Sequence, residues 1–151
     1  MAAVTTDALL HETRARHHAR CWVCGQANTH GLDVLFRSIG GGEVEGTFAC
    51  SDAYAGYDGL LHGGVISSLL DGAMTNCLMA RGMVGLTVEL RVRFRRPVLT
   101  GRPAPLRAHP AGQRGPVARV AAELWQEGEL LVTAEGKFLP HPQQRWTARA
   151  G

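Results

Sequence analysis

Hydrophobic residues dominate residues 63–80, whereas most of the remaining chain alternates hydrophobic with polar positions. The apolar stretch contains Val65, Ile66, Leu69, Leu70, Ala73, Met74, Cys77, Leu78 and Met79. A helix that is hydrophobic nearly all round lies inside a protein, because none of its faces suits water. The pattern therefore predicts a long buried helix, which we expect to end near Arg81-Gly82.

Six strands and a second helix are predicted around this buried helix. Residues 86–95 alternate strictly, with apolar residues on one face and polar residues on the other, and Pro97 ends this half-buried strand. The other predicted strands are residues 32–39, 43–50, 103–109, 117–125 and 130–139, and residues 6–20 form a short N-terminal helix. Short turns, such as Glu127-Gly128, favour antiparallel pairing. The order predicts an α+β fold, with an antiparallel sheet wrapped around one central helix.

Length and composition point to one globular domain over residues 1–140, followed by a polar tail over residues 141–151. The chain has 151 residues, of which 45% are hydrophobic and 19% charged. A net charge of +3 suits an anionic small ligand better than nucleic acid, which requires a denser basic patch. Asp71 and Asn76 make residues 63–80 a poor membrane span, and no signal peptide is visible, so we expect a cytoplasmic protein.

A single carboxylate, Asp71, interrupts the apolar helix. Burying an unpaired carboxylate costs several kcal/mol, and a group with such a cost is often functional. Asp71 is either a reactive group or a structural carboxylate that accepts hydrogen bonds from Ser67, Ser68 or a backbone group. Gly63 lies at the start of the same helix, where free N–H groups and the helix dipole favour developing negative charge.

The string from His62 to Asp71, His-Gly-Gly-Val-Ile-Ser-Ser-Leu-Leu-Asp, resembles the hotdog-fold acyl-CoA thioesterases of the PaaI type. The resemblance covers residues 21–140. It includes the 87–94 strand with the following Arg-Pro-Val, Gly56-Tyr57-x-Gly59, and Cys-x-x-Cys-Gly followed by Asn-x-x-Gly-Leu. It implies a hotdog fold and hydrolysis of an acyl-CoA thioester, and we expect no cofactor.

The resemblance also implies roles for individual residues. Asp71 matches the catalytic carboxylate, acting as nucleophile or general base, and the Gly63 backbone N–H matches the donor to the thioester oxygen. Thr75, one turn after Asp71, resembles a threonine that holds the carboxylate or a water in one branch of the family. Thr87 matches a hydroxyl residue of another branch and is a candidate for substrate binding. His62 is a catalytic candidate, although fixing the start of the helix suits its position better.

Further substrate-binding candidates flank these residues. We expect Gly64 and Tyr57 to line the site, and Arg91 to contact the phosphates of CoA, with Arg93 and Arg95 as alternatives. Some family members carry Asn or Gln seven residues before the oxyanion glycine. This chain has Gly56 there, and Tyr57 or Asp58 are the candidates to replace the missing carboxamide.

The spacing of Gly63 and Asp71 predicts a shared site. Eight residues separate them, which is about 12 Å along one helix at ~1.5 Å per residue. We therefore do not expect one helix to bring both groups to the same thioester. Two such helices, antiparallel across a two-fold axis, place Asp71 of one chain near Gly63 of the other. We expect a homodimer or a dimer of dimers that binds acyl-CoA, without nucleic acid or membrane as a partner.

Cys21 and Cys24, with His17 and His18 before them, have the spacing of zinc ligands. Adjacent histidines before Cys-x-x-Cys match no common zinc finger, however. A turn of small residues anchored by Trp22 is the favoured alternative, and we expect reduced cysteines and no metal.

Two other functions are compatible with the same fold. The chain is alternatively a non-catalytic module that binds acyl-CoA or an acyl carrier in the same groove. A hotdog dehydratase is less favoured, because those enzymes place a His–carboxylate pair differently and His62 here precedes the helix. The acyl group cannot be deduced from the sequence.

Overall fold

The structure is a computed structural model that describes residues 6–142, so the predicted polar tail lies almost entirely outside the described residues. Two α-helices, six strands and one 3-10 turn follow one another in the order expected from the sequence. They are α1 (Thr6–His17), β1 (Arg37–Gly40), β2 (Glu43–Phe48), η1 (Asp52–Tyr54), α2 (Gly63–Met79), β3 (Gly85–Phe94), β4 (Ala104–Arg114), β5 (Val117–Gln126) and β6 (Glu129–Pro140).

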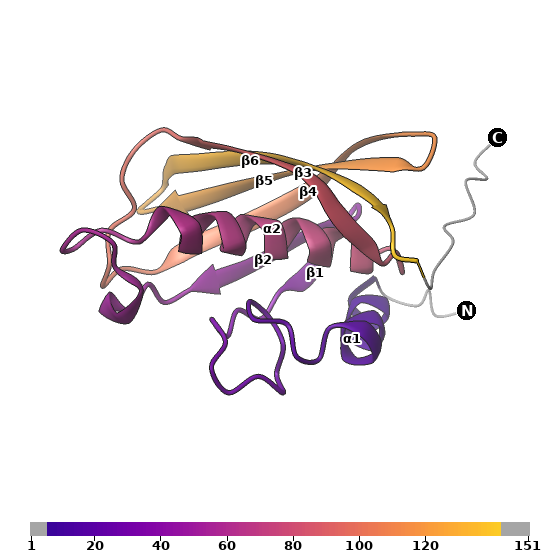
Figure 1. Ribbon diagram of the computed structural model, residues 1–151, viewed down its shortest axis with the longest axis horizontal. Helices are drawn as coiled ribbons and strands as arrows, with labels where there is room; N and C mark the ends of the chain where they lie inside the picture. The colour runs from indigo at the N-terminus through magenta and orange to yellow at the C-terminus, as the bar shows by residue number, and fades with distance from the viewer. Residues whose placement is uncertain (1–5, 143–151) are drawn as a thin grey trace.

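The strands form one antiparallel sheet that curls around α2. The strand order is β1-β2-β4-β5-β6-β3, and Figure 1 shows α2 lying between the β1–β2 and the β3–β5–β6 parts of this sheet. Every residue of α2 from Gly72 to Met79 is buried, which is why this stretch is apolar apart from Thr75 and Asn76. The predicted hotdog fold, an antiparallel sheet around one central helix with a short helix before it, is confirmed. In residues 6–142 no helix combines the length and apolarity needed to cross a membrane.

Turn chemistry accounts for the register of the last hairpin. Glu127 and Gly128 both have positive φ, +50° and +78°, which is the conformation that a two-residue turn between twisted strands requires. The first predicted strand is shorter than expected. Val34 and Phe36, within the predicted strand over residues 32–39, are buried in the core, but strand pairing begins only at Arg37.

Strand β3 contains a bulge that the strict alternation of the sequence does not reveal. Thr87 lies opposite Phe138 of β6, whereas Glu89 lies opposite Lys137, so one extra residue is present on β3. Directly opposed residues point to the same face. Phe138 is fully buried, so Thr87 also faces α2, while Glu89 points outward and pairs with Lys137 at 3.1 Å.

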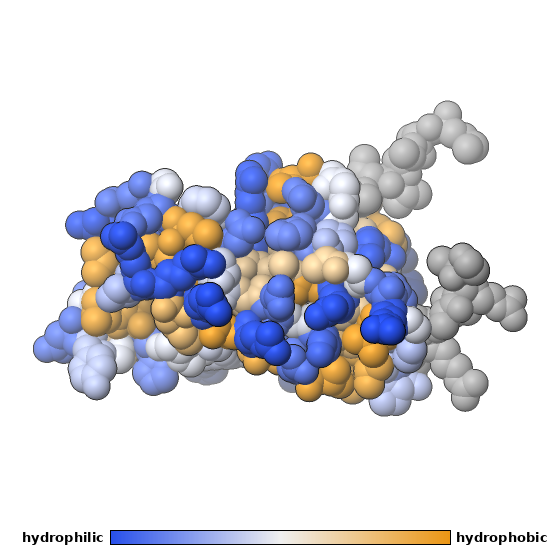
Figure 2. Space-filling view, turned by 90° about the horizontal axis from the view of Figure 1, so that it is seen from above, coloured by the Kyte–Doolittle hydropathy of each residue, from blue (hydrophilic) through white to orange (hydrophobic). Residues whose placement is uncertain are grey.

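The prediction that five apolar residues of β3 share one face is therefore wrong. Leu86 points away from α2, opposite Leu139, whereas Leu90 and Phe94 lie on the helix side beyond the bulge. These side chains stay exposed, because β3 is the last strand of the sheet and α2 does not cover it fully. The outer surface seen in Figure 2 accordingly mixes hydrophobic patches with hydrophilic ones.

The loop after α1 packs on the middle of α2. Val23 is 6% exposed and lies against Gly72, where a Cβ atom would be 2.6 Å from the Val23 Cγ1 atom. Only glycine permits this close approach. Trp22, predicted to be the anchor of this turn, is 43% exposed, so the anchoring residue is Val23 instead. None of the four cysteines, which all lie among the described residues, is in a disulfide.

Candidate active site

His62 caps the start of α2 and leaves the N–H of the first helical residue, Gly63, without a partner among the described residues. The Gly64 N–H donates to His62 Nδ1 at 2.8 Å, and the His62 backbone is extended, as expected of an N-cap residue. His62 thus fixes the start of the helix. The Gly63 N–H has no hydrogen-bond acceptor among the described residues. Gly63 thus presents an available donor at the positive end of the helix dipole, and unlike Val65 it lines the groove described next.

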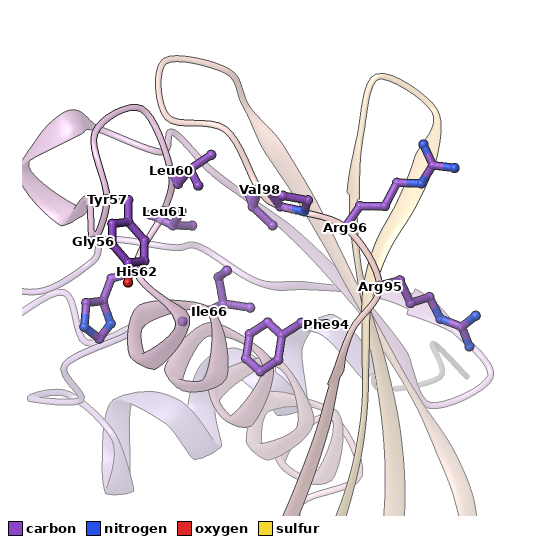
Figure 3. A pocket seen from close by; sticks show the side chains of 12 residues that line it. Gly56, Tyr57, Leu60, Leu61, His62, Ile66, Phe94, Arg95, Arg96 and Val98 are labelled. Atoms are coloured by element: carbon purple, nitrogen blue, oxygen red, sulfur yellow. The ribbon is translucent and has the colours of Figure 1, made fainter.

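A groove of about 740 Å³ opens in front of this donor. Gly63 and Ile66 from α2 line it together with Phe94 from the end of β3, and the Phe94 ring lies beside the start of α2 (Figure 3). A Cβ atom on Gly63 would lie 3.7 Å from the Phe94 ring. The remaining lining residues are Gly56, Tyr57, Leu60, Leu61, His62, Arg95, Arg96, Pro97 and Val98. The groove is therefore mostly apolar, with a backbone N–H at one wall.

Tyr57 and Gly56 lie in this groove, and the arginines lie at its edge. Tyr57 is 85% exposed, so its ring is free to contact a bound molecule. Arg95 and Arg96 point away from the groove in Figure 3, and Arg96 pairs with Glu129 at 2.9 Å. Arg91 does not line the groove but lies farther along β3, 3.6 Å from Glu89. Arg96 lines the groove but was not among the predicted substrate-binding residues; the feature of the sequence that could have indicated it is its position between the end of a strand and Pro97.

Asp71 lies on the same helix as Gly63, in the part that the sheet covers. Thr87 Oγ1 donates a hydrogen bond to Asp71 Oδ1 at 2.7 Å. Burial raises the pKa of Asp71 above its ordinary value, and this effect exceeds the lowering of the pKa by the Thr87 hydrogen bond. A thiolate at Cys21 raises the pKa slightly further and His18 opposes it. Asp71 is thus a half-buried carboxylate with a raised pKa and one fixed oxygen, an arrangement that can serve to accept a proton.

The hydroxyl groups of α2, unlike that of Thr87 on β3, do not contact the Asp71 carboxylate. Ser67 and Ser68 donate to the backbone carbonyls of Gly63 and Gly64, and Thr75 donates to the backbone carbonyl of Asp71. The serines therefore do not supply the partners that a purely structural Asp71 was expected to have. Among residues 6–142, Thr87 supplies the one side-chain partner of the carboxylate, and the β3 bulge turns Thr87 toward the helix.

Gly63 and Asp71 do not meet within one chain. Both are part of α2, eight residues apart, and Asp71 does not line the groove that contains Gly63. At ~1.5 Å per residue the separation along the axis is about 12 Å, as the sequence predicted. One chain thus presents a free backbone N–H in a groove and, two turns later, a carboxylate that does not line that groove.

A second group of reactive side chains lies on the loop before β1. The donor atoms of His18, Cys21 and Cys24 lie within 4.8 Å of one another, so the loop brings in one of the two adjacent histidines.

Comparison with known proteins decides the family. The family model of the thioesterase superfamily matches residues 58–133, which is half of the chain and includes the start of α2, Asp71 and Thr87. The chain belongs to the thioesterase superfamily. Among curated proteins, no sequence matches this member of the superfamily.

Solved structures of other superfamily members share the fold. One thioesterase superfamily protein is 29% identical, with a TM-score of 0.74, over 78% of this chain and 61% of the other. A phenylacetic acid degradation-related protein from Ralstonia eutropha JMP134 is 25% identical, with a TM-score of 0.68, over 82% and 97% of the two chains. The E. coli PaaI protein is 17% identical, with a TM-score of 0.76, over 92% and 96%. The resemblance to hotdog-fold thioesterases of the PaaI type is confirmed.

Proposed function

We propose that the protein is an acyl-CoA thioesterase in which Asp71 is the general base and Gly63 of the partner subunit is the oxyanion donor. The observation that carries the proposal is the pair of groups on α2: a free N–H at an apolar groove and a half-buried carboxylate held by Thr87. The N–H suits the thioester oxygen, which becomes negatively charged, and the carboxylate suits the attacking water, which must lose a proton. The separation of the two groups along one helix requires a second chain.

The chemistry needs only water as co-reactant. Asp71 accepts a proton from a water molecule whose oxygen attacks the thioester carbonyl, and the carbonyl oxygen becomes negatively charged beside the Gly63 N–H. The tetrahedral intermediate collapses, the C–S bond breaks, and the CoA thiolate takes the proton back from Asp71. The products are a carboxylic acid and CoA. In the alternative, Asp71 is the nucleophile: its oxygen attacks the thioester carbonyl, the C–S bond breaks with release of CoA, and water then hydrolyses the anhydride. Attack of that water at the Asp71 carbonyl places label from H₂¹⁸O on the enzyme in a single turnover, which the general-base route never does.

The free edge of β3 supports a two-chain site. In residues 6–142, β3 pairs only with β6, so its other edge offers unpaired backbone groups together with the exposed side chains of Val88, Leu90 and Phe94. Phe94 also lines the groove beside Gly63. An antiparallel copy that pairs along this edge buries apolar surface at the groove, which is the isologous arrangement of a two-fold dimer.

An apolar groove with arginines at its edge suits a CoA ester. The acyl chain takes the apolar part, and Arg95, a lining residue at the edge of the groove, is the candidate for contact with the phosphate groups. Proteins of the same fold bind such molecules: structures from Streptococcus pneumoniae TIGR4 and Streptococcus mutans UA159 hold coenzyme A and acetyl-CoA, at 15% and 16% identity.

A panel of acyl-CoA and aryl-CoA esters, assayed for release of free thiol, tests the activity. Asp71→Asn should lose hydrolysis while keeping the fold and the oligomer, because the amide cannot accept the proton. Asp52→Asn, which alters an exposed aspartate of η1, is the matched control and should hydrolyse normally. Binding of CoA esters without hydrolysis by the unmodified protein would instead identify the non-catalytic binding module.

Mixing two inactive variants tests the shared site. Gly63→Pro removes the N–H at the first helical position, where proline is tolerated, and the extended backbone of His62 suits a following proline. Gly63→Ala keeps the N–H and is the control. If Asp71 and Gly63 act across the interface, a hybrid of Asp71→Asn and Gly63→Pro subunits contains one intact site and regains activity. If both groups act within one chain, every hybrid site is defective and no activity returns.

A further inference from the structure

The loop between α1 and β1 brings three metal-ligating side chains together away from the groove. His18 Nδ1 lies 3.6 Å from Cys24 Sγ, and the Cys21 sulfur lies within 4.8 Å of both. Cys24 is buried, whereas His18 and Cys21 are half-buried, so the cluster has one protected side and one side open to solvent. The proposed thioesterase reaction uses none of these three residues.

The spacing of these atoms matches the edge of a zinc tetrahedron. Zinc binds thiolate sulfur at about 2.3 Å and imidazole nitrogen at about 2.0–2.1 Å. Two such bonds at the tetrahedral angle hold the sulfur and the nitrogen roughly 3.6 Å apart, and the observed distance between His18 Nδ1 and Cys24 Sγ is 3.6 Å. A disulfide between Cys21 and Cys24 would need no histidine at this place.

Both sulfur atoms also accept hydrogen bonds from N–H groups. The Val23 N–H donates to Cys21 Sγ at 3.4 Å, and the Asn76 side-chain amide donates to Cys24 Sγ at 3.3 Å. Such donors stabilise thiolates and orient the ligands of a metal. Cys77 differs, because its S–H donates to the Gly42 carbonyl at 3.0 Å, as an uncharged thiol does.

Hydrogen bonds and close packing hold the framework around the cluster in place. Asn76 is held by its own bond to the Gly72 carbonyl at 2.8 Å and by Arg14 at 3.2 Å. The turn after Cys24 is closed by a bond from the Gly25 N–H to the Cys21 carbonyl at 2.8 Å. A Cβ atom on Gly25 would lie 2.3 Å from the Cys21 nitrogen, so only glycine fits there.

We propose that His18, Cys21 and Cys24 bind a Zn²⁺ ion, with water in the fourth position on the half-exposed side. The ion fastens the loop to α2, since Asn76 bonds to one ligand and Val23, between the two cysteines, lies against Gly72. Gly72 directly follows Asp71, so the metal holds in place the loop beside the carboxylate. This site differs from the groove and stands whether or not the protein hydrolyses thioesters.

The test measures metal binding by the full-length protein, purified with a reductant, without reference to activity. Elemental analysis should find about one zinc per chain. After removal of the metal by a chelator, Co²⁺ should give the sulfur-to-cobalt charge-transfer band and the intense visible bands of a tetrahedral thiolate site. Cys24→Ser and His18→Ala should weaken metal binding at least tenfold. The matched controls Cys50→Ala and His17→Ala should retain one equivalent.

A second measurement needs no variant and covers the case in which Cys24→Ser does not fold. One equivalent of Zn²⁺ should slow alkylation of Cys21 and Cys24 in the unmodified protein, as followed by mass spectrometry, without slowing alkylation of Cys50 and Cys77. The proposal is overturned if the reduced protein binds no Zn²⁺ at micromolar concentration. It is equally overturned if the two thiols gain no protection, or if Cys21 and Cys24 are isolated as a disulfide despite the reductant.

Discussion

Replacing Thr87 with valine should raise the pKa of Asp71 and shift the acid side of the pH–rate profile to higher pH. Thr87 Oγ1 donates to the Asp71 carboxylate at 2.7 Å, and valine has the same shape without the donor. A hydrogen bond to a charged acceptor contributes ~1.5–3 kcal/mol, and because Thr87 is exposed, water partly replaces it, which favours the lower end. At ~1.4 kcal/mol per pKa unit, the expected shift is about one unit.

The direction of the shift follows from the two effects on Asp71. Burial raises the pKa of Asp71, and the hydrogen bond from Thr87 lowers it, so removing the hydrogen bond raises the pKa further. The base acts only when ionised. The midpoint of the acid limb of kcat/KM should therefore rise by about one pH unit, while kcat/KM on the alkaline plateau changes much less.

Thr75→Val is the matched control for this experiment. Its hydroxyl donates to the backbone carbonyl of Asp71 at 3.0 Å and not to the carboxylate, so this variant should lose some stability without shifting the midpoint. Thr87→Ser keeps a donor and should restore the original profile. Equal midpoints for Thr87→Val and the unmodified enzyme would refute the view that Thr87 sets the ionisation of Asp71.

Three other changes test separate features of the structure. Gly72→Ala places a Cβ atom 2.6 Å from Val23. The overpacking costs about 1–3 kcal/mol, which outweighs the gain of about 1 kcal/mol in helix propensity. Urea unfolding should therefore show a free energy of unfolding lower by about 1 kcal/mol, and this loss should shrink in a Val23→Ala background. Asp71→Asn should be more stable than the unmodified protein at pH 7. Burial raises the pKa of Asp71 above its ordinary 3.8, so the folded state binds more protons than the unfolded state, and the unmodified protein loses stability as the pH rises above about 4. The stability advantage of Asp71→Asn should therefore vanish near pH 4. A stability difference that stays constant across pH would contradict this explanation. Val88→Lys on the free edge of β3 should shift the oligomer toward monomer in light scattering and reduce hydrolysis, whereas Leu35→Lys, another exposed apolar position, should change neither.

Much of the fold follows from local sequence patterns. The central helix is apolar on all sides because the sheet surrounds it, and its limits agree with the sequence to within a few residues. The turn at Glu127-Gly128 and the strands on either side of it were predicted nearly in full. These elements depend on periodicity and turn chemistry, which are visible in a short window of residues.

The details of the site depend on contacts between distant segments, which one sequence does not reveal. The bulge at Val88 exists only relative to β6, so strict alternation wrongly placed Thr87 on the face away from the helix. The choice between His17 and His18 likewise depends on where α1 ends. The helix stops at His17, three residues earlier than predicted, and His18 then lies in the loop beside the two cysteines.

The free edge of β3 also bears on solubility. A strand with one unpaired edge and exposed apolar residues is a template for uncontrolled sheet growth, so an isolated subunit risks aggregation. Arg91, Arg93 and Arg95 alternate with the apolar residues along this strand. Such charges act as gatekeepers, because stacking many identical edges in register would bring like charges together. The strand thus combines a surface that favours pairing once with a charge pattern that opposes fibril growth.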